Sequence, residues 1–156
     1  MTSSTRLTLA LALALAGCKA TPPGQFERAV AAQVKRYVTV GGTSDRNPLV
    51  ATEENVRRGR EAFSSFCVAC HGLDGQNTGV PFADAMSPPV PQLTAPEVQQ
   101  YTDGQLHWII ENGLFPSGMP GASGILNDEE MWRIVLYIRH LPPAGSLGEP
   151  AIYSAN

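Results

Sequence analysis

The chain has 156 residues, enough for one domain of ordinary size with short appendages but not for a second catalytic domain. Its formal net charge is −3, and after Val68 only Arg133 and Arg139 are basic, against nine acidic residues. This acidic part argues against nucleic acid as a partner and against docking through a ring of lysines, while 15 Gly and 13 Pro indicate long ordered loops.

Residues 1–17 have the features of an export signal. Arg6 supplies a positive charge, and the run Leu7–Ala16 contains only Leu, Ala and one Thr, which is too short to span a bilayer. The signal ends in LAGC, which resembles the lipobox of bacterial lipoproteins and implies that Cys18 becomes a lipidated N-terminus. The alternative is an ordinary signal peptide that leaves Cys18 as a free thiol. We expect an exported protein, lipid-anchored to the cell envelope and facing the periplasm or the outer surface.

Residues 18–51 are expected to form a lipidated tether with a possible short helix. Apolar residues at Phe26, Val30 and Val34 have helical spacing and predict a helix over 26–40, although the end of this stretch, YVTV, has strand character. The turn-rich segment 41–50 is expected to lie against the following domain.

Residues 52–143 are the predicted folded domain, and 144–156 a C-terminal arm. The first domain helix is expected to begin near Thr52, which can cap it. Val56, Phe63 and Phe66 then follow on one face. Gly59 lies on the same face, and because a glycine within a helix costs about 1 kcal/mol relative to alanine, it indicates a close helix crossing.

The segment Cys67–His71 reads CVACH. Two thiols separated by two residues can each add across a vinyl group of one haem, and a histidine directly after the second thiol falls beneath the iron as an axial ligand. A zinc knuckle would need a second pair of soft ligands, a redox CxxC pair would need a βαβ context, and a disulfide is the remaining alternative. The spacing predicts one covalent haem c on Cys67 and Cys70, with His71 as the proximal iron ligand.

The residues after His71 predict loops around the haem and three further helices. A glycine-rich loop over 72–79 and a proline-rich wall over 81–92 are expected to border the haem, with a backbone carbonyl around Pro88 or Pro89 holding the second ring nitrogen of His71. Helices are predicted after capping boxes that begin at Thr94, Thr102 and Asn127, the last helix running from Asp128 to Leu141.

Met86 and Met119 are the available candidates for a sixth iron ligand, since Met1 lies in the signal and Met131 within the last predicted helix. A thioether is a soft ligand that suits an electron-transfer haem. Met119 lies in a glycine-flanked loop that can come close to a flat ligand, but a loop methionine can equally be packing.

Two histidines compete with methionine for the sixth position. His107 lies on a predicted helix, and His140 lies at a predicted helix C-terminus, where a cation is favoured. We interpret both as surface or packing residues.

The order of motifs over residues 53–142 resembles a class I monohaem cytochrome c of the bacterial type. The motifs are CVACH, HGLDG, SGMP and the segment LNDEEMW that continues to YIRHLP. The resemblance implies an all-α cytochrome c fold with four or so short helices and long loops wrapped around one covalently attached haem. It also implies Met119 as the distal ligand, and a crossing of Gly59 and Phe63 with the last helix near Trp132 and Tyr137.

Three functions fit these observations. The first is a membrane-anchored electron carrier, not an enzyme, that exchanges single electrons with a protein donor and acceptor and has no small-molecule substrate. The second is a fixed haem-carrying subunit of a larger respiratory or oxidising complex. The third is a haem enzyme or gas sensor with a displaceable sixth ligand, which is disfavoured because no acid–base cluster accompanies the motif.

Overall fold

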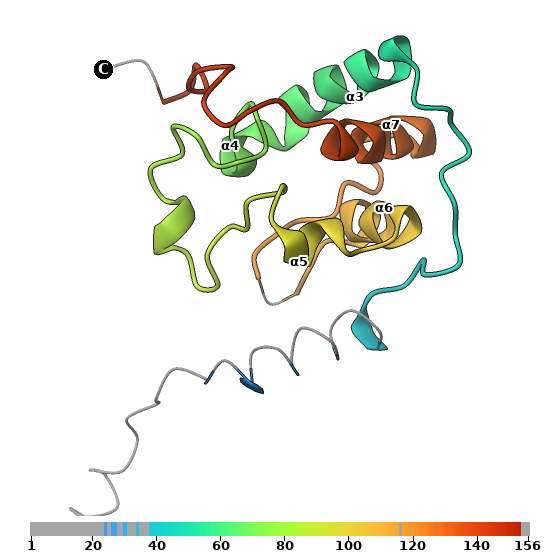
Figure 1. Cartoon of the computed structure of the whole chain (residues 1–156), viewed down its shortest axis with the longest axis horizontal. Helices are drawn as coiled ribbons and strands as arrows, with labels where there is room; N and C mark the ends of the chain where they lie inside the picture. The colour runs from blue at the N-terminus through green and yellow to red at the C-terminus, as the bar shows by residue number, and fades with distance from the viewer. Residues whose placement is uncertain are drawn as a thin grey trace, which may run out of the picture. The chain divides into compact units, whose positions relative to one another are not determined.

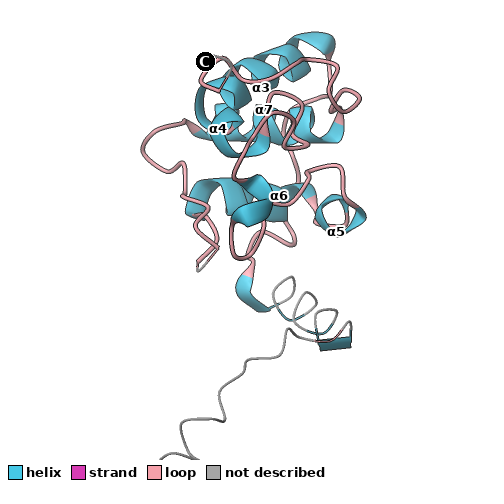
Figure 2. Ribbon diagram, turned by 90° about the vertical axis from the view of Figure 1, so that its left-hand side faces the viewer, coloured by secondary structure: helices cyan, strands magenta, loops and turns pink. Residues whose placement is uncertain are grey.

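The structure is a computed structural model, and it describes residues 24, 26–27, 30, 34, 38–115 and 117–153. The predicted signal peptide and Cys18 lie outside these ranges. Within them the chain forms helices and loops and no strand apart from two isolated bridges (Figure 2), which confirms the all-α prediction. No helix of the described part is long and apolar enough to cross a membrane.

The chain divides into two units, Met1–Val34 and Lys35–Asn156. In the first unit the described residues Phe26, Glu27, Val30 and Val34 are helical, in agreement with the predicted helix. In the second unit Val38 and Thr39 form a helical turn, so the strand character of this stretch is not realised.

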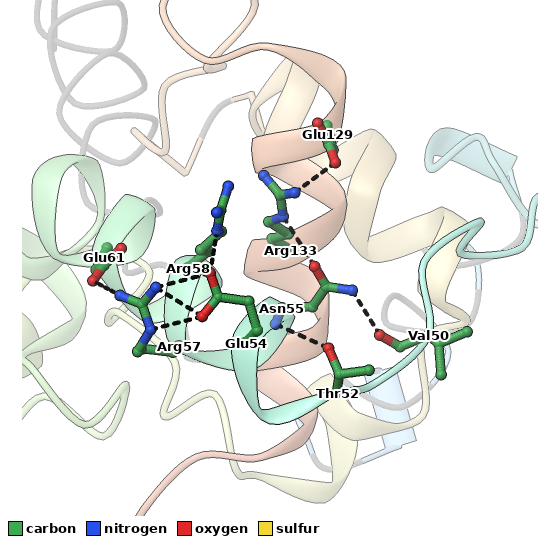
Figure 3. Close-up of polar contacts among 9 residues, drawn as sticks. All are labelled: Val50, Thr52, Glu54, Asn55, Arg57, Arg58, Glu61, Glu129 and Arg133. Atoms are coloured by element: carbon green, nitrogen blue, oxygen red, sulfur yellow. Dashed lines mark hydrogen bonds and ion pairs between the residues drawn. The ribbon is translucent and has the colours of Figure 1, made fainter.

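The first helix of the domain, α3 (Glu53–Phe66), begins where the sequence predicts. The Thr52 hydroxyl accepts a hydrogen bond from the backbone N–H of Asn55 at 3.2 Å. Glu54 pairs with Arg57 and Arg58 on the exposed side of the helix (Figure 3). Because these ion pairs are exposed, each contributes little to stability, and the helix depends on its opposite face.

That opposite face packs against α7 (Asp128–Arg139), which lies beside α3 in the fold (Figure 1). A β-carbon on Gly59 would collide with the backbone carbonyl of Arg133, and the Phe63 ring meets the Tyr137 ring edge-on, with centroids 5.2 Å apart. The predicted crossing at Gly59 is therefore confirmed. Its neighbour on α7 is Arg133 and not Trp132, which instead stacks on His107.

Two of the three predicted capping boxes are confirmed. Thr102 caps α6 (Asp103–Asn112) and Asn127 caps α7, and in each the side chain three residues later bonds back to the cap. The box at Thr94 is wrong, because α5 (Pro96–Gln99) begins after Ala95 with no side-chain cap. The Thr94 hydroxyl instead donates to Gln76 at 3.1 Å, a partner in the loop after His71.

The core lies between α3, α6 and α7. Its buried residues include Phe63, Leu106, Ile110, Ile134 and Val135. The connector over 41–50 packs on this core, as expected: the Asn47 amide donates to the Trp132 carbonyl at 3.0 Å. A β-carbon on Gly104 would collide with the Gly42 carbonyl, so the connector and α6 approach closely through two glycines.

The C-terminal arm folds back over the residues around His71. The Gly145 N–H donates to Asp74 at 2.7 Å, and the Tyr153 hydroxyl donates to the Ala69 carbonyl at 2.7 Å. Pro150 between them is fully buried. No sequence signal predicts this packing, because the arm has no regular apolar spacing.

Candidate cofactor site

The two thiols of the CVACH segment are placed by a helix junction. Cys67 ends α3 and also begins α4 (Val68–His71), and its carbonyl accepts the backbone N–H of His71 at 3.0 Å. One further turn of helix therefore separates Cys67 from Cys70 and His71. Both cysteines are free thiols, so the structure does not support the disulfide alternative. Across the described ranges no three His, Cys, Asp or Glu side chains are grouped so that they could hold a metal ion.

The His71 imidazole is buried and lacks a complete set of partners. Its Nδ1 makes no hydrogen bond of ordinary geometry, and the Phe63 ring lies against it with centroids 6.4 Å apart. Burial lowers the pKa of His71 to about 4, an effect that the Pro91 carbonyl opposes. The imidazole is therefore neutral at pH 7, the form that binds a metal.

The sequence predicts that a carbonyl around Pro88 or Pro89 holds the second ring nitrogen of His71. The carbonyl that acts on His71 instead belongs to Pro91. The segment that carries it is held by backbone bonds, because Val90 donates to Ala83 at 2.9 Å and Leu93 donates to Gly75 at 2.8 Å. The proline-rich run therefore follows a path that brings its last proline, and not its first, to the ring.

A cavity of about 290 Å³ lies beside these groups. It is lined by Cys67, Cys70 and His71 on one part of its wall and by Gly118, Met119 and Pro120 on another. None of the described residues that line it is Asp, Glu, Lys or Arg. Two thiols, one neutral imidazole and the thioethers of Met86 and Met119 thus share an apolar hollow, a set of groups that fits a covalently attached haem.

Met119 reaches the cavity from the loop between α6 and α7. The Leu114 N–H donates to the Met119 carbonyl at 3.0 Å, and Gly113 has a φ of 75°, a conformation that favours glycine. A side chain on Gly113 would also collide with the backbone of Pro120 and Gly121. The two ends of the loop are therefore held together by the Leu114–Met119 hydrogen bond, and the absence of a side chain on Gly113 allows them to approach.

The structure brings Met86 to the same cavity as Met119. Met86 follows the short 3-10 helix η2 (Ala83–Ala85), and its backbone N–H donates to Phe82 at 3.2 Å. Met131, in contrast, is buried in the core on α7. Of the three methionines that the structure describes, the two that the sequence retained as candidates are the two that line the cavity.

The competing histidines lie elsewhere. His107 stacks on Trp132 with ring centroids 4.0 Å apart, and its Nε2 lies 2.9 Å from an Asp128 carboxylate oxygen. His140 is exposed, and its Nδ1 lies 2.8 Å from the Leu136 carbonyl. Neither is among the described residues that line the cavity, which supports their interpretation as packing and surface residues.

Asp74 is a site residue that sequence reasoning missed. It is fully buried, and its carboxylate accepts hydrogen bonds from the backbone of Gln76, the Thr78 hydroxyl and the backbone of Gly145. Burial acts to raise the pKa of Asp74, but these hydrogen bonds outweigh it and hold the pKa below its ordinary value. The carboxylate thus orders the loop that follows His71.

Comparison with known proteins identifies two similarities. Residues 54–138, more than half of the chain, match the family described as cytochrome C oxidase, cbb3-type, subunit III. The quinohemoprotein alcohol dehydrogenase ADH IIB of Pseudomonas putida is 27% identical over 95 residues, which cover 58% of this chain and 12% of that protein. The chain therefore spans only about an eighth of the length of this curated relative.

Proposed function

We propose that this chain, which belongs to the family described as cytochrome C oxidase, cbb3-type, subunit III, is a one-haem electron carrier. The cytochrome c domain of this family implies covalent haem c and electron transfer. The observation that carries this proposal is the shared cavity: both thiols, His71 and Met119 line one apolar hollow. When bound, haem c supplies an iron that alternates between Fe(II) and Fe(III).

Each residue of the cavity has a role in this proposal. Cys67 and Cys70 form the thioether bonds, His71 is the proximal ligand and Met119 the distal ligand. If the N–H of the His71 ring donates a hydrogen bond to the Pro91 carbonyl, the other ring nitrogen keeps the lone pair that binds a metal. With both axial positions filled by side chains, no substrate can bind at the iron, so we propose a carrier that is not an enzyme.

We also propose that the protein is exported and anchored through a lipid on Cys18. The LAGC sequence supports this, since cleavage before Cys18 would leave a lipidated N-terminus. The segment 18–51 would then join the anchor to the haem domain of residues 52–143. Such a tether lets the haem domain meet a redox protein donor and acceptor near the membrane surface.

A second candidate is a fixed relay subunit of a larger complex. The family is described as a subunit of an oxidase, and the relative from Pseudomonas putida is a much longer enzyme. Both observations favour this alternative. Purification from native membranes separates the two. A monomer that is released alone by detergent supports the carrier, and co-purification with other subunits in fixed ratio supports the relay.

Expression of the full chain with haem-maturation machinery tests the main proposal. We expect a haem mass that survives denaturation, a reversible one-electron change of the visible spectrum, and a near-infrared methionine-to-iron band in the oxidised form. Met119→Ala should lose that band and lower the reduction potential, because a soft thioether favours Fe(II). Absence of covalent haem, or rapid stoichiometric binding of carbon monoxide and cyanide by the wild type, contradicts the proposal.

A further inference from the structure

The loop that carries Met119 is fixed at its base and exposed at its tip. At the base, Leu114 bonds to Met119, and the Ala122 N–H donates to the Ile110 carbonyl at 2.8 Å. At the tip, the Phe115 side chain is 99% exposed and Gly118 is exposed. Within the loop, the Ser117 N–H and hydroxyl both donate to the Leu114 carbonyl. An exposed tip of this kind can open at small free-energy cost unless something outside the loop holds it.

The Met86 side chain lies beside this tip at Gly118. Gly118 has no β-carbon, but one built at this position would lie 3.5 Å from the Met86 methyl carbon, so the methyl group lies next to Gly118. If Gly118 and its two chain neighbours are left out, the Met86 methyl carbon is the described heavy atom that lies within 4 Å of the built β-carbon. Met86 and Gly118 both line the cavity, so their proximity brings two parts of its wall together beside Met119.

The segment that presents Met86 is itself well held. The Met86 N–H is bonded to Phe82, the Val90 N–H to Ala83, and the Asn77 amide donates to the Val90 carbonyl at 2.8 Å. A methionine on a held segment can fill the irregular space beside a glycine, because its unbranched side chain adapts to the gap.

We propose that Met86 is a positioning residue that holds the Met119 loop closed over the cofactor cavity. This inference rests on the proposed ligation by His71 and Met119. An external ligand can reach the iron only when Met119 leaves it, so its apparent affinity depends on the fraction of molecules with an open loop. Loss of the Met86 contact raises that fraction.

Imidazole titration of the oxidised full-length holoprotein measures the open fraction. Met86→Ala should bind imidazole about tenfold more tightly than the wild type and lose the near-infrared methionine band at correspondingly lower imidazole. Met86→Leu retains the side-chain volume without the sulfur and should bind imidazole as the wild type does. Phe115→Ala removes a larger side chain from the same loop, but one that is almost fully exposed, and should also leave the affinity unchanged.

The outcomes separate this proposal from the ligation on which it rests. If Met119→Ala leaves the spectrum unchanged, the ligation fails, and the role of Met86 fails with it. If Met119→Ala changes the spectrum but Met86→Ala binds imidazole like the wild type, the ligation stands and the positioning role is overturned. Equal gains in affinity for Met86→Ala and Met86→Leu also overturn it, because the sulfur and not the packing would then matter.

Discussion

At the scale of single residues, Asp74 is a buried charge that organises the chain around His71. Its two oxygens are held by the backbone of Gln76, the Thr78 hydroxyl and the backbone of Gly145, so one carboxylate joins the loop after the haem motif to the C-terminal arm. A buried carboxylate that accepts hydrogen bonds from a full set of donors stabilises the fold. If the carboxylate is replaced, a buried donor loses its acceptor, and this destabilises the fold.

Asp74→Asn should therefore lower the free energy of unfolding at pH 7, by about 1–3 kcal/mol. The amide NH₂ would face groups that are donors in the wild type and leave one of them unpaired. Because the folded pKa of Asp74 is lowered, its contribution is present above the ordinary value of 3.8 and is lost as pH falls through the folded pKa. Denaturant unfolding at several pH values checks this, and a difference between the variants that persists undiminished well below pH 3.8 would contradict it.

The sequence predicts which candidate attachment residues lie at one cavity better than it predicts their surroundings. Cys67, Cys70 and His71 are close in sequence, and one helical junction is enough to bring them to one cavity. Met119 could be placed at the cavity but not separated from Met86 by residue type alone, and both methionines do line it. The partner of Asp74 at Gly145 could not be predicted, because the contact joins positions 71 residues apart.

At the scale of elements, the crossing of α3 and α7 depends on one missing side chain. Gly59 lets the Arg133 carbonyl approach the α3 backbone, and the crossing then brings the rings of Phe63 and Tyr137 together. The Tyr137 hydroxyl donates to the Leu73 carbonyl at 2.9 Å. The crossing thus connects the helix pair to the loop that follows His71.

Gly59→Ala should lower the free energy of unfolding, by about 2 kcal/mol. Alanine gains about 1 kcal/mol in helix propensity, but its methyl group meets a backbone carbonyl that cannot rotate away, so the two helices must separate. Thermal unfolding of the holoprotein is the measurement. Ser65→Ala, on the exposed side of the same helix, is the matched control and should change stability by only a few tenths of a kcal/mol. A Gly59→Ala protein as stable as the control would mean that the crossing tolerates a wider spacing.

Helix starts were predictable where a cap depends on nearby residues alone. Thr102 with Gln105 and Asn127 with Glu130 make both bonds of the capping box. Thr94 has the same pattern with Glu97, but a distant acceptor on Gln76 takes its hydroxyl instead. A local pattern cannot foresee such a tertiary competitor. The C-terminal arm escaped prediction for the same reason, since its contacts with Asp74 and Ala69 are all distant in sequence.

At the scale of the whole molecule, basic and acidic residues are separated along the chain. From Lys19 to Phe66 there are eight Lys and Arg against five acidic residues, whereas the chain after Val68 is strongly acidic. A domain of this sign steers partners of opposite charge toward itself and is repelled by anionic lipid headgroups. The acidic domain therefore does not favour membrane attachment by itself, and in our proposal the attachment comes from the lipid on Cys18.

Cys18→Ser should release the protein from membranes. A diacylated cysteine buries two hydrocarbon chains, each contributing about 0.8 kcal/mol per buried CH₂, and removal of the sulfur removes both chains at once. The measurement is the haem absorbance of membrane and soluble fractions after a high-salt wash, which also eliminates electrostatic attachment. Thr21→Ser, outside the LAGC motif, is the control and should stay with the membrane. If Cys18→Ser also stays there, a second attachment holds the protein, either a retained signal segment or a membrane partner, and the relay-subunit candidate gains support over the free carrier.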